Sequence, residues 1–323
     1  MTSDSKFFQR KSVVTITAVL CCVLWGSAFP ALKLSYEHMI ITNESQRLLV
    51  AGIRFVLSGA GILVFQRLRM KTSIMPQRRE MPMILLMGVV QTFIAYVLYY
   101  IAIANTTGVK SSVLASSGIF FTVLFASIAV RSDRINRMQA LGMLLGLAGL
   151  VCVNFSSLSS LDLSFTFKGE GLLLIHCALI SAFLVIVRKY AQNMDVVKIN
   201  GWQFLIGGLL LIAVGWIGSP QPLQMDAVAA GLLGYLAAIS AVTMSVWYVL
   251  LRYHSVSMLE QYKFLMPLIG SLFSVVMLPG EHLGPELLVA ALLVAGGIVL
   301  VNRKNSAEVQ STAAKAVDVN TQS

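Results

Sequence analysis

The chain has 323 residues, of which 57% are hydrophobic and only 12% are charged, and its mean hydropathy is +0.80. A soluble globule of this size cannot bury so many apolar side chains, so the composition excludes most soluble classes and predicts a protein whose solvent is lipid. The formal net charge of +10 is spread beside the ends of apolar runs rather than gathered in a basic domain, which indicates membrane orientation and argues against a nucleic-acid partner.

Ten apolar runs fill most of the chain, each about as long as the ~20 residues that a helix needs to cross a bilayer. Within the runs there is no sustained alternation of apolar and polar residues, which favours helices over barrel strands. We therefore expect an all-α membrane protein with ten transmembrane helices. In chain order the runs are 13–34, 46–65, 82–104, 109–130, 138–155, 170–187, 198–217, 227–251, 255–277 and 283–301.

Basic residues are concentrated in alternate loops, which would all lie on the same side of the membrane. Most of the 24 Lys and Arg residues fall in the N-terminal segment, in the loops after the second, fourth, sixth and eighth runs, and after the tenth. The loops on the other side contain little beyond Lys110 and Lys168. Because cytoplasmic loops carry an excess of Lys and Arg, both termini are predicted to be cytoplasmic. Residues 1–12 and 304–323 are then tails, and the second is polar enough to predict disorder.

The second half of the chain resembles the first. Ser27-Ala28-Phe29 recurs as Ser181-Ala182-Phe183, and Tyr99 falls over Tyr248 when the halves are offset by 149 residues. Because each half holds an odd number of runs, the second must enter the membrane from the opposite face to the first. Inverted repeats of this kind are typical of secondary transporters. The predicted repeats are 13–155 and 170–303.

Several short motifs are distributed along these runs. They are Trp25-Gly26-Ser27-Ala28-Phe29, Lys33, Arg54-Phe55, the run from Pro267 to Glu281, and Gly296-Gly297-Ile298. On these residues the chain resembles the EamA family of the drug/metabolite transporter superfamily over nearly its whole length. The first half departs from the family pattern, with Gly118 where the family has Pro and Asp133 where it has Glu. The resemblance implies a ten-helix, exporter-like permease whose central cavity is lined by spans one, three, four, six, eight and nine.

Two prolines inside predicted spans point toward the interior of the bundle. Pro30 and Pro267 each remove a backbone donor, and the resulting kink can leave carbonyl groups facing a cavity. A purely structural kink is the alternative. The resemblance implies that Gly118 is the first-half counterpart of Pro267, at a position where a helix could bend during gating. Trp25 and Ser27 lie near the middle of the first span and are candidate substrate contacts, with helix packing as the alternative.

The ninth span contains the sharpest polar signal. Glu260, Lys263 and Pro267 are spaced i, i+3, i+7 and share one helix face, with Gln261 beside it. A charged residue near the bilayer centre costs on the order of 2.5–3.5 kcal/mol, so Lys263 should face water, a partner or a substrate. The alternative is that Lys263 extends to the cytoplasmic interface and pairs with Glu260. Lys263 and Gln261 are candidate substrate-binding residues.

Further candidates come from the aromatic residues and the one histidine inside a predicted span. His176 could accept a proton near neutral pH and so couple transport to protons, or it could be a packing residue. Tyr96, Tyr99, Trp247 and Tyr248 lie at corresponding places in the two halves. They would stack on an organic substrate at cavity depth, or form a lipid-facing belt near an interface.

Arg54 and Lys33 lie within a few turns of the predicted outer face. Long basic side chains near a span end can extend to the interface, so both are predicted to anchor their helices. A role in an outer vestibule is the alternative.

The sequence lacks the motifs that are typical of several other function classes. Gly108-Val109-Lys110-Ser111 lacks the glycine that precedes the lysine in a phosphate-binding loop, which argues against an ATP-driven pump. The four cysteines fall inside predicted spans with no histidine at ligand spacing, so neither a metal nor another cofactor is expected.

We therefore expect a secondary transporter of the cytoplasmic (inner) membrane, a monomer or homodimer, rather than an enzyme. Amino acids or related metabolites as the small-molecule substrates follow from the resemblance only. Multidrug or dye efflux is the alternative. A membrane-embedded enzyme or accessory protein using Lys263, Glu260 and His176 is the third hypothesis.

Overall fold

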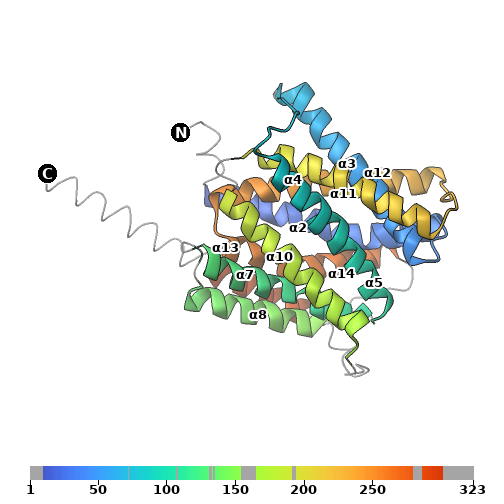
Figure 1. The fold of residues 1–323 in the computed structure, drawn as a ribbon. Helices are drawn as coiled ribbons and strands as arrows, with labels where there is room; N and C mark the ends of the chain where they lie inside the picture. Colours follow the sequence, from blue (N-terminus) through green and yellow to red (C-terminus); the bar gives the residue numbers. More distant parts are fainter. Residues whose placement is uncertain are drawn as a thin grey trace, which may run out of the picture.

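The computed structural model describes residues 10–71, 73–106, 108–130, 133, 135–153, 165–190, 194–278 and 286–300. This part of the chain contains helices and no strands, which confirms the predicted all-α class (Figure 1). The predicted tail 304–323, most of the predicted tail 1–12 and Glu281 lie outside the described residues.

Within the described ranges, six helices are long and apolar enough to cross a membrane. They are α2 (Lys11–His38); α3 (Glu44–Phe65), continued by η1 (Gln66–Met70); α4 (Met81–Leu86), continued by η2 (Met87–Ile94) and α5 (Ala95–Ala104); η4 (Phe167–Gly171), continued by α10 (Leu172–Tyr190); α11 (Val196–Gly218); and α12 (Ala227–Tyr253).

The other predicted spans fall on shorter helices. α6 (Gly108–Ala115) and α7 (Ser117–Ala129) occupy the fourth predicted span, and α8 (Arg137–Val153) occupies the fifth. The ninth contains α13 (Val256–Glu260), the 3-10 segment η5 (Gln261–Phe264) and α14 (Leu265–Met277). The tenth contains an apolar helix at Glu286–Leu300.

Short polar side chains define where the long helices begin. Asn43, Asp195 and Asp226 precede α3, α11 and α12, and each accepts a hydrogen bond from the backbone amide three residues later. Such caps satisfy donors that the first helical turn leaves unpaired. The bond from the Ala229 amide, with a further contact from His38, holds the pKa of the Asp226 carboxyl below its usual value.

Polar contacts join helix ends at one end of the bundle. The Val256 amide donates to Asp133 Oδ2 (2.7 Å), and Arg188 Nε lies 3.7 Å from the same carboxylate. Gln66 Nε2 donates to Asp195 Oδ2 (3.2 Å). The ends of α7 and α10 therefore meet the start of α13, and the end of α3 meets the start of α11. We call this the basic end, because it holds Arg67, Arg69, Lys71, Arg78, Arg79, Arg137, Arg188, Lys189, Lys198 and Arg252.

A second set of contacts joins the opposite end of the bundle. Thr106 Oγ1 donates to Glu170 Oε1 (2.7 Å), which joins the end of α5 to the start of η4. His38 Nδ1 lies 2.8 Å from Asp226 Oδ2, which joins the end of α2 to the start of α12. Successive long helices therefore run in alternating directions between the two ends.

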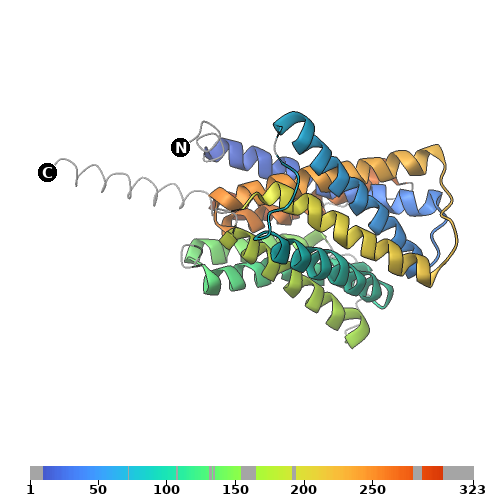
Figure 2. The same ribbon diagram turned by 45° about the horizontal axis from the view of Figure 1, so that its top comes forward.

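α3 and α11 lie side by side in close, antiparallel contact (Figure 2). A Cβ on Gly59 would lie 2.5 Å from the carbonyl oxygen of Gly201, and a Cβ on Gly52 would lie 2.8 Å from that of Gly208. Gly52 and Gly59 match Gly201 and Gly208 at the same offset of 149 residues that relates Tyr99 to Tyr248. Each glycine contact is thus the counterpart of the other, as in a pair of repeats related by a two-fold axis.

The glycines of α8 also allow close helix packing. Gly146 packs against the ring of Phe264, and Gly149 lies against Val294. A Cβ on Gly297 would lie 2.7 Å from the carbonyl oxygen of Gly142. Small residues allow helix backbones to approach in this way within a membrane.

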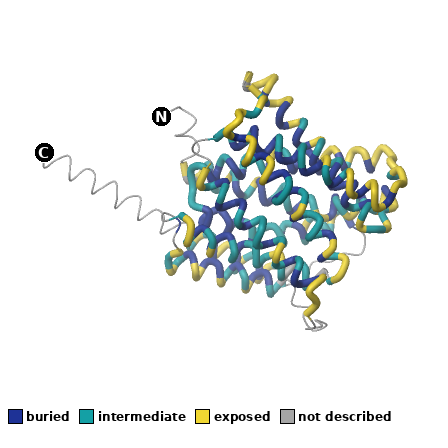
Figure 3. Tube along the Cα trace, in the orientation of Figure 1, coloured by how far each residue is buried: buried dark blue, intermediate teal, exposed yellow. Residues whose placement is uncertain are grey.

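Large apolar side chains cover much of the outer surface of the bundle. Ile217 and Val276 are 80% and 83% exposed, and Figure 3 shows buried positions alternating with exposed ones along the helices. An apolar exterior of this extent suits contact with lipid.

The α3–α11 contact can be tested with two alanine substitutions on one helix. Gly59→Ala should lower the free energy of unfolding in detergent by about 1–3 kcal/mol, because the new methyl group meets the backbone of α11. The loss should appear as a lower melting temperature. Gly61→Ala is the control, since a Cβ there meets no atom within 4 Å, and it should change stability by less than ~1 kcal/mol. Equal melting temperatures for the two variants would contradict the crossing.

Candidate functional site

A cavity of about 220 Å³ lies between six of the helical segments. Its wall is formed by α2, α3, α5 with η2, α10, α11 and α12. The lining residues are Trp25, Ala28, Arg54, Phe55, Gln91, Thr92, Tyr96, His176, Ile180, Gln203, Phe204, Leu236, Ile239, Ser240 and Met244. The resemblance implied spans four and nine where the structure has spans two and seven. The difference arises because α3 and α11 pack against each other and place Arg54, Phe55, Gln203 and Phe204 in the wall.

The wall contains matched residues from the two halves. The rings of Phe55 and Phe204 stack with centroids 4.9 Å apart and an interplanar angle of 26°. These two residues are counterparts at the offset of 149, and so are their neighbours Arg54 and Gln203. The cavity therefore lies between the two halves of the chain.

Arg54 is a site residue that the sequence analysis misassigned. It was expected to anchor α3 at the outer face, but it lines the cavity, with its guanidinium carbon 4.7 Å from the centroid of the Phe55 ring. Its Nε is buried without a hydrogen-bond partner among the described residues. The signal that could have located it is the recurrence of Arg54-Phe55 as Gln203-Phe204.

Two buried glutamines form the polar part of the wall. Gln91 Nε2 donates to the hydroxyl of Tyr248 (2.8 Å), and Gln203 Nε2 donates to the same hydroxyl (3.1 Å). The side-chain oxygens of both glutamines are buried and have no partner among the described residues. Tyr248, itself fully buried, lies behind the wall and orients both amides.

His176 and Tyr96 line the cavity as predicted candidates, and Tyr99 packs behind them. His176 Nδ1 lies 2.7 Å from the carbonyl oxygen of Ala95. A carbonyl only accepts, so Nδ1 carries a proton, and in the neutral form of the ring Nε2 is then the acceptor. The Tyr99 and His176 ring centroids are 5.0 Å apart.

Lys263 does not line the cavity. Its Nζ lies 2.7 Å from Glu260 Oε1, and its charge lies 5.2 Å from the ring centroid of Trp247 and 5.8 Å from that of Trp25. The side chains of Lys263 and Glu260 are 20% and 2% exposed, so the pair is largely buried. The pairing with Glu260 that the sequence left as the alternative is present, and Trp25 is the contact between this pair and the cavity wall.

Three other candidates join helices instead of lining the cavity. Ser27 Oγ lies 2.8 Å from the hydroxyl of Tyr235 on α12. Gln261 Nε2 donates to the carbonyl oxygen of Gln139 (3.4 Å). Trp247 is fully buried and packs edge-on against Trp25, with ring centroids 5.0 Å apart.

The predicted kink residues also lie outside the cavity wall. α2 continues through Pro30 as one helix. Pro267 is the third residue of α14, and the 3-10 segment η5 precedes it, because a proline cannot donate to the carbonyl four residues back. Gly118 follows the break between α6 and α7, and its carbonyl oxygen accepts from Thr122 Oγ1 (2.7 Å) and Ser181 Oγ (2.8 Å).

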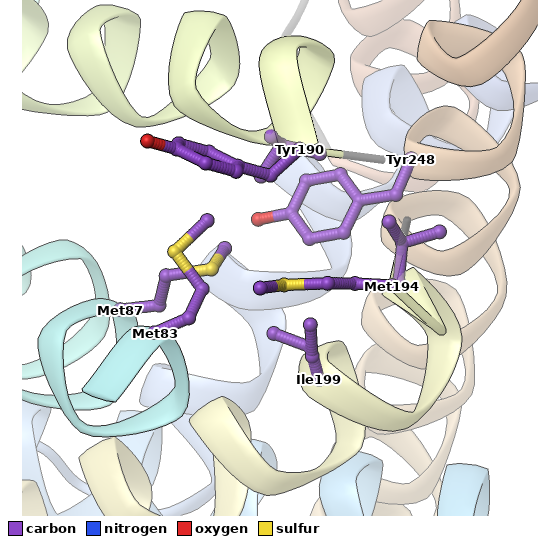
Figure 4. A pocket seen from close by; sticks show the side chains of 8 residues that line it. Met83, Met87, Tyr190, Met194, Ile199 and Tyr248 are labelled. Atoms are coloured by element: carbon purple, nitrogen blue, oxygen red, sulfur yellow. The ribbon is translucent and has the colours of Figure 1, made fainter. Parts of the chain in front are cut away.

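A second hollow near the basic end is too small to hold a substrate. Figure 4 shows Tyr190 and Tyr248 beside the thioethers of Met83, Met87 and Met194. Its volume of about 10 Å³ leaves room for about one water molecule. Among the described residues, no group of His, Cys, Asp or Glu side chains is arranged to hold a metal ion.

Comparison with known proteins identifies the family. The EamA-like transporter family matches residues 13–155 and 167–303. The chain belongs to this family. Its family and the description of one relative as an efflux pump indicate a multi-pass membrane transporter of the drug/metabolite transporter superfamily rather than an enzyme.

Two relatives and one solved structure show the extent of the likeness. A chloroplastic WAT1-related protein of Arabidopsis thaliana is 29% identical over 207 residues, which are 61% of this chain and about half (49%) of that protein. A Salmonella typhimurium protein described as a probable amino-acid metabolite efflux pump is 25% identical over 300 residues, covering 88% of this chain and 92% of that protein. One crystal structure aligns with a TM-score of 0.74 at 18% identity, over 90% of this chain and 97% of that chain, which shows the fold alone.

The placement of Lys263 generates a prediction about stability. Lys263→Met should lower the free energy of unfolding in detergent by about 3–5 kcal/mol, because it leaves the Glu260 carboxylate buried and unpaired. The double variant Lys263→Met/Glu260→Gln should regain most of the loss. If it is as unstable as the single variant, the ion pair is not what Lys263 contributes.

Proposed function

We propose that this EamA-family protein is a secondary transporter that exports small metabolites, such as amino acids, across the cytoplasmic membrane by alternating access. The observation that carries the proposal is the cavity on the interface between the two halves. Carriers of this kind bind substrate near the midplane, between repeats that move against each other. The description of the Salmonella relative as a probable amino-acid metabolite efflux pump supports this substrate class.

The proposal includes ten crossings, with inverted repeats at 13–155 and 170–303 and both termini in the cytoplasm. The contacts at the helix ends support it. Thr15, near the start of α2, contacts Tyr262 of η5 (2.9 Å) and so lies toward the basic end, whereas η4 begins the second repeat at the opposite end beside Thr106. A cytoplasmic basic end follows from the excess of Lys and Arg there.

The close crossing of α3 and α11 is the natural fulcrum for such a motion. The two helices belong to different halves and touch through their backbones, so in this proposal they stay together while the rest of each half moves. Pro30, Gly118 and Pro267, outside the cavity wall, are then proposed as positions that absorb helix bending. His176 is the residue through which a proton gradient could act on the cavity.

Export of larger amphipathic compounds is the second candidate, favoured by the aromatic part of the wall. Trp25, Phe55, Tyr96 and Phe204 offer broad apolar faces. However, the cavity volume of about 220 Å³ is below the ~300–1,000 Å³ of sites for drug-sized ligands. The smaller substrate class is therefore the first proposal.

Counterflow in proteoliposomes tests the proposed function. Vesicles containing the purified protein are loaded with a mixture of amino acids and related metabolites, and uptake of each labelled compound is measured with and without a pH gradient. Exchange of a small metabolite is expected, and an effect of the gradient would show proton coupling. If folded, inserted protein exchanges none of them but exchanges amphipathic dyes, the second candidate replaces the first. If it exchanges neither, the carrier proposal fails.

A further inference from the structure

The cavity wall carries one positive charge with no protein counter-charge. Arg54 lines the cavity, and among the described residues no carboxylate lies within ion-pair distance of its guanidinium. By contrast, Lys110, Arg188, Lys198 and Lys263 each lie within 4 Å of a carboxylate. A cation in an apolar interior is unfavourable without a partner. The cavity therefore favours a bound anion.

The geometry around Arg54 restricts the chemistry of that anion. The guanidinium presents several donors in a planar fork that matches the two oxygens of a carboxylate. The other polar groups of the wall, including Gln91 and Gln203, are uncharged, so a singly charged carboxylate would neutralise the site. A doubly charged phosphate would leave a net negative charge buried, which makes it the less favourable ligand.

The glutamines add a second requirement. Gln91 and Gln203 are 3% and 0% exposed, and their side-chain oxygens have no partner within the described part of the chain. A buried acceptor without a donor is costly. A ligand that supplies an N–H, ammonium or hydroxyl group to these oxygens would remove that cost.

We propose that Arg54 is the specificity-determining residue of the cavity and binds the carboxylate of the substrate, while the oxygens of Gln91 and Gln203 accept hydrogen bonds from a donor group elsewhere on it. This inference rests on the proposed function, since it names the substrate class of the same cavity. It assigns the anion site to α3, at the α11 crossing, rather than to the paired Lys263.

Matched pairs of small molecules test the assignment by binding alone. Acetate, benzoate, L-leucine and L-phenylalanine, each with its carboxamide, are titrated into the detergent-solubilised protein while thermal stability is followed. Wild type should prefer at least one carboxylate over its carboxamide by roughly ten- to a hundredfold. Arg54→Gln should abolish that preference. Chloride at equal ionic strength is included because it could neutralise the same cation.

The matched control is Arg47→Gln. Arg47 lies on the same helix, two turns away, with its guanidinium carbon 6.0 Å from the ring centroid of Tyr36, and it does not line the cavity. This variant should keep the carboxylate preference of the wild type. The proposal is overturned if wild type prefers no carboxylate of the panel, if chloride stabilises it equally well, or if Arg54→Gln retains the preference.

If Arg54→Gln does not fold, the assignment of Arg54 as the carboxylate site can be tested on wild-type protein. The preferred carboxylate should slow modification of Arg54 by phenylglyoxal, followed by peptide mass spectrometry, and its carboxamide should not. Equal protection by both, or by neither, would overturn the assignment. Because these are binding measurements, carboxylate preference without counterflow would sustain the inference and reject the transport proposal, while counterflow without the preference would do the reverse.

Discussion

Backbone contact between α3 and α11 holds the two halves of this molecule together and positions the cavity wall. Because Gly52, Gly59, Gly201 and Gly208 have no side chains, the two helices approach closely enough for the stacked rings of Phe55 and Phe204 to lie at their crossing. Their sequence neighbours, Arg54 and Gln203, are thereby brought into the cavity wall. The position and the composition of the cavity thus follow from where four glycines occur in the sequence.

Polar groups within the bundle divide into those with protein partners and those without. Asp133 and Glu170 are hydrogen-bonded at the two ends, and Glu260 pairs with Lys263. These contacts connect helices and account for charges that would otherwise be costly in an apolar medium. Arg54 Nε and the oxygens of the two cavity glutamines form a different group, because they are buried without a hydrogen-bond partner among the described residues.

The sequence predicted the helical class and the positions of the six long apolar helices, because hydropathy and length depend on local composition. Lys263 shows what local spacing can predict. Its i, i+3 placement relative to Glu260 gave the ion pair as one of two interpretations. Arg54 shows the limit. Its distance from the span end suggested an interface anchor, and only the pairing of α3 with α11 brings it to the cavity. Tyr248 was a candidate for stacking on substrate, yet it lies behind Gln91 and Gln203, an arrangement that depends on tertiary contacts.

The central claim is that the two halves pivot about a fixed α3–α11 crossing, and distances between spin labels test it most directly. One pair at the basic end, Arg69 with Lys189, one at the opposite end, Glu37 with Met225, and one beside the crossing, Leu57 with Leu209, would be measured with and without an exchanged compound. The account predicts opposite changes at the two ends and a constant distance at the crossing. A crossing distance that changes as much as the end distances, or two ends that open together, would contradict it.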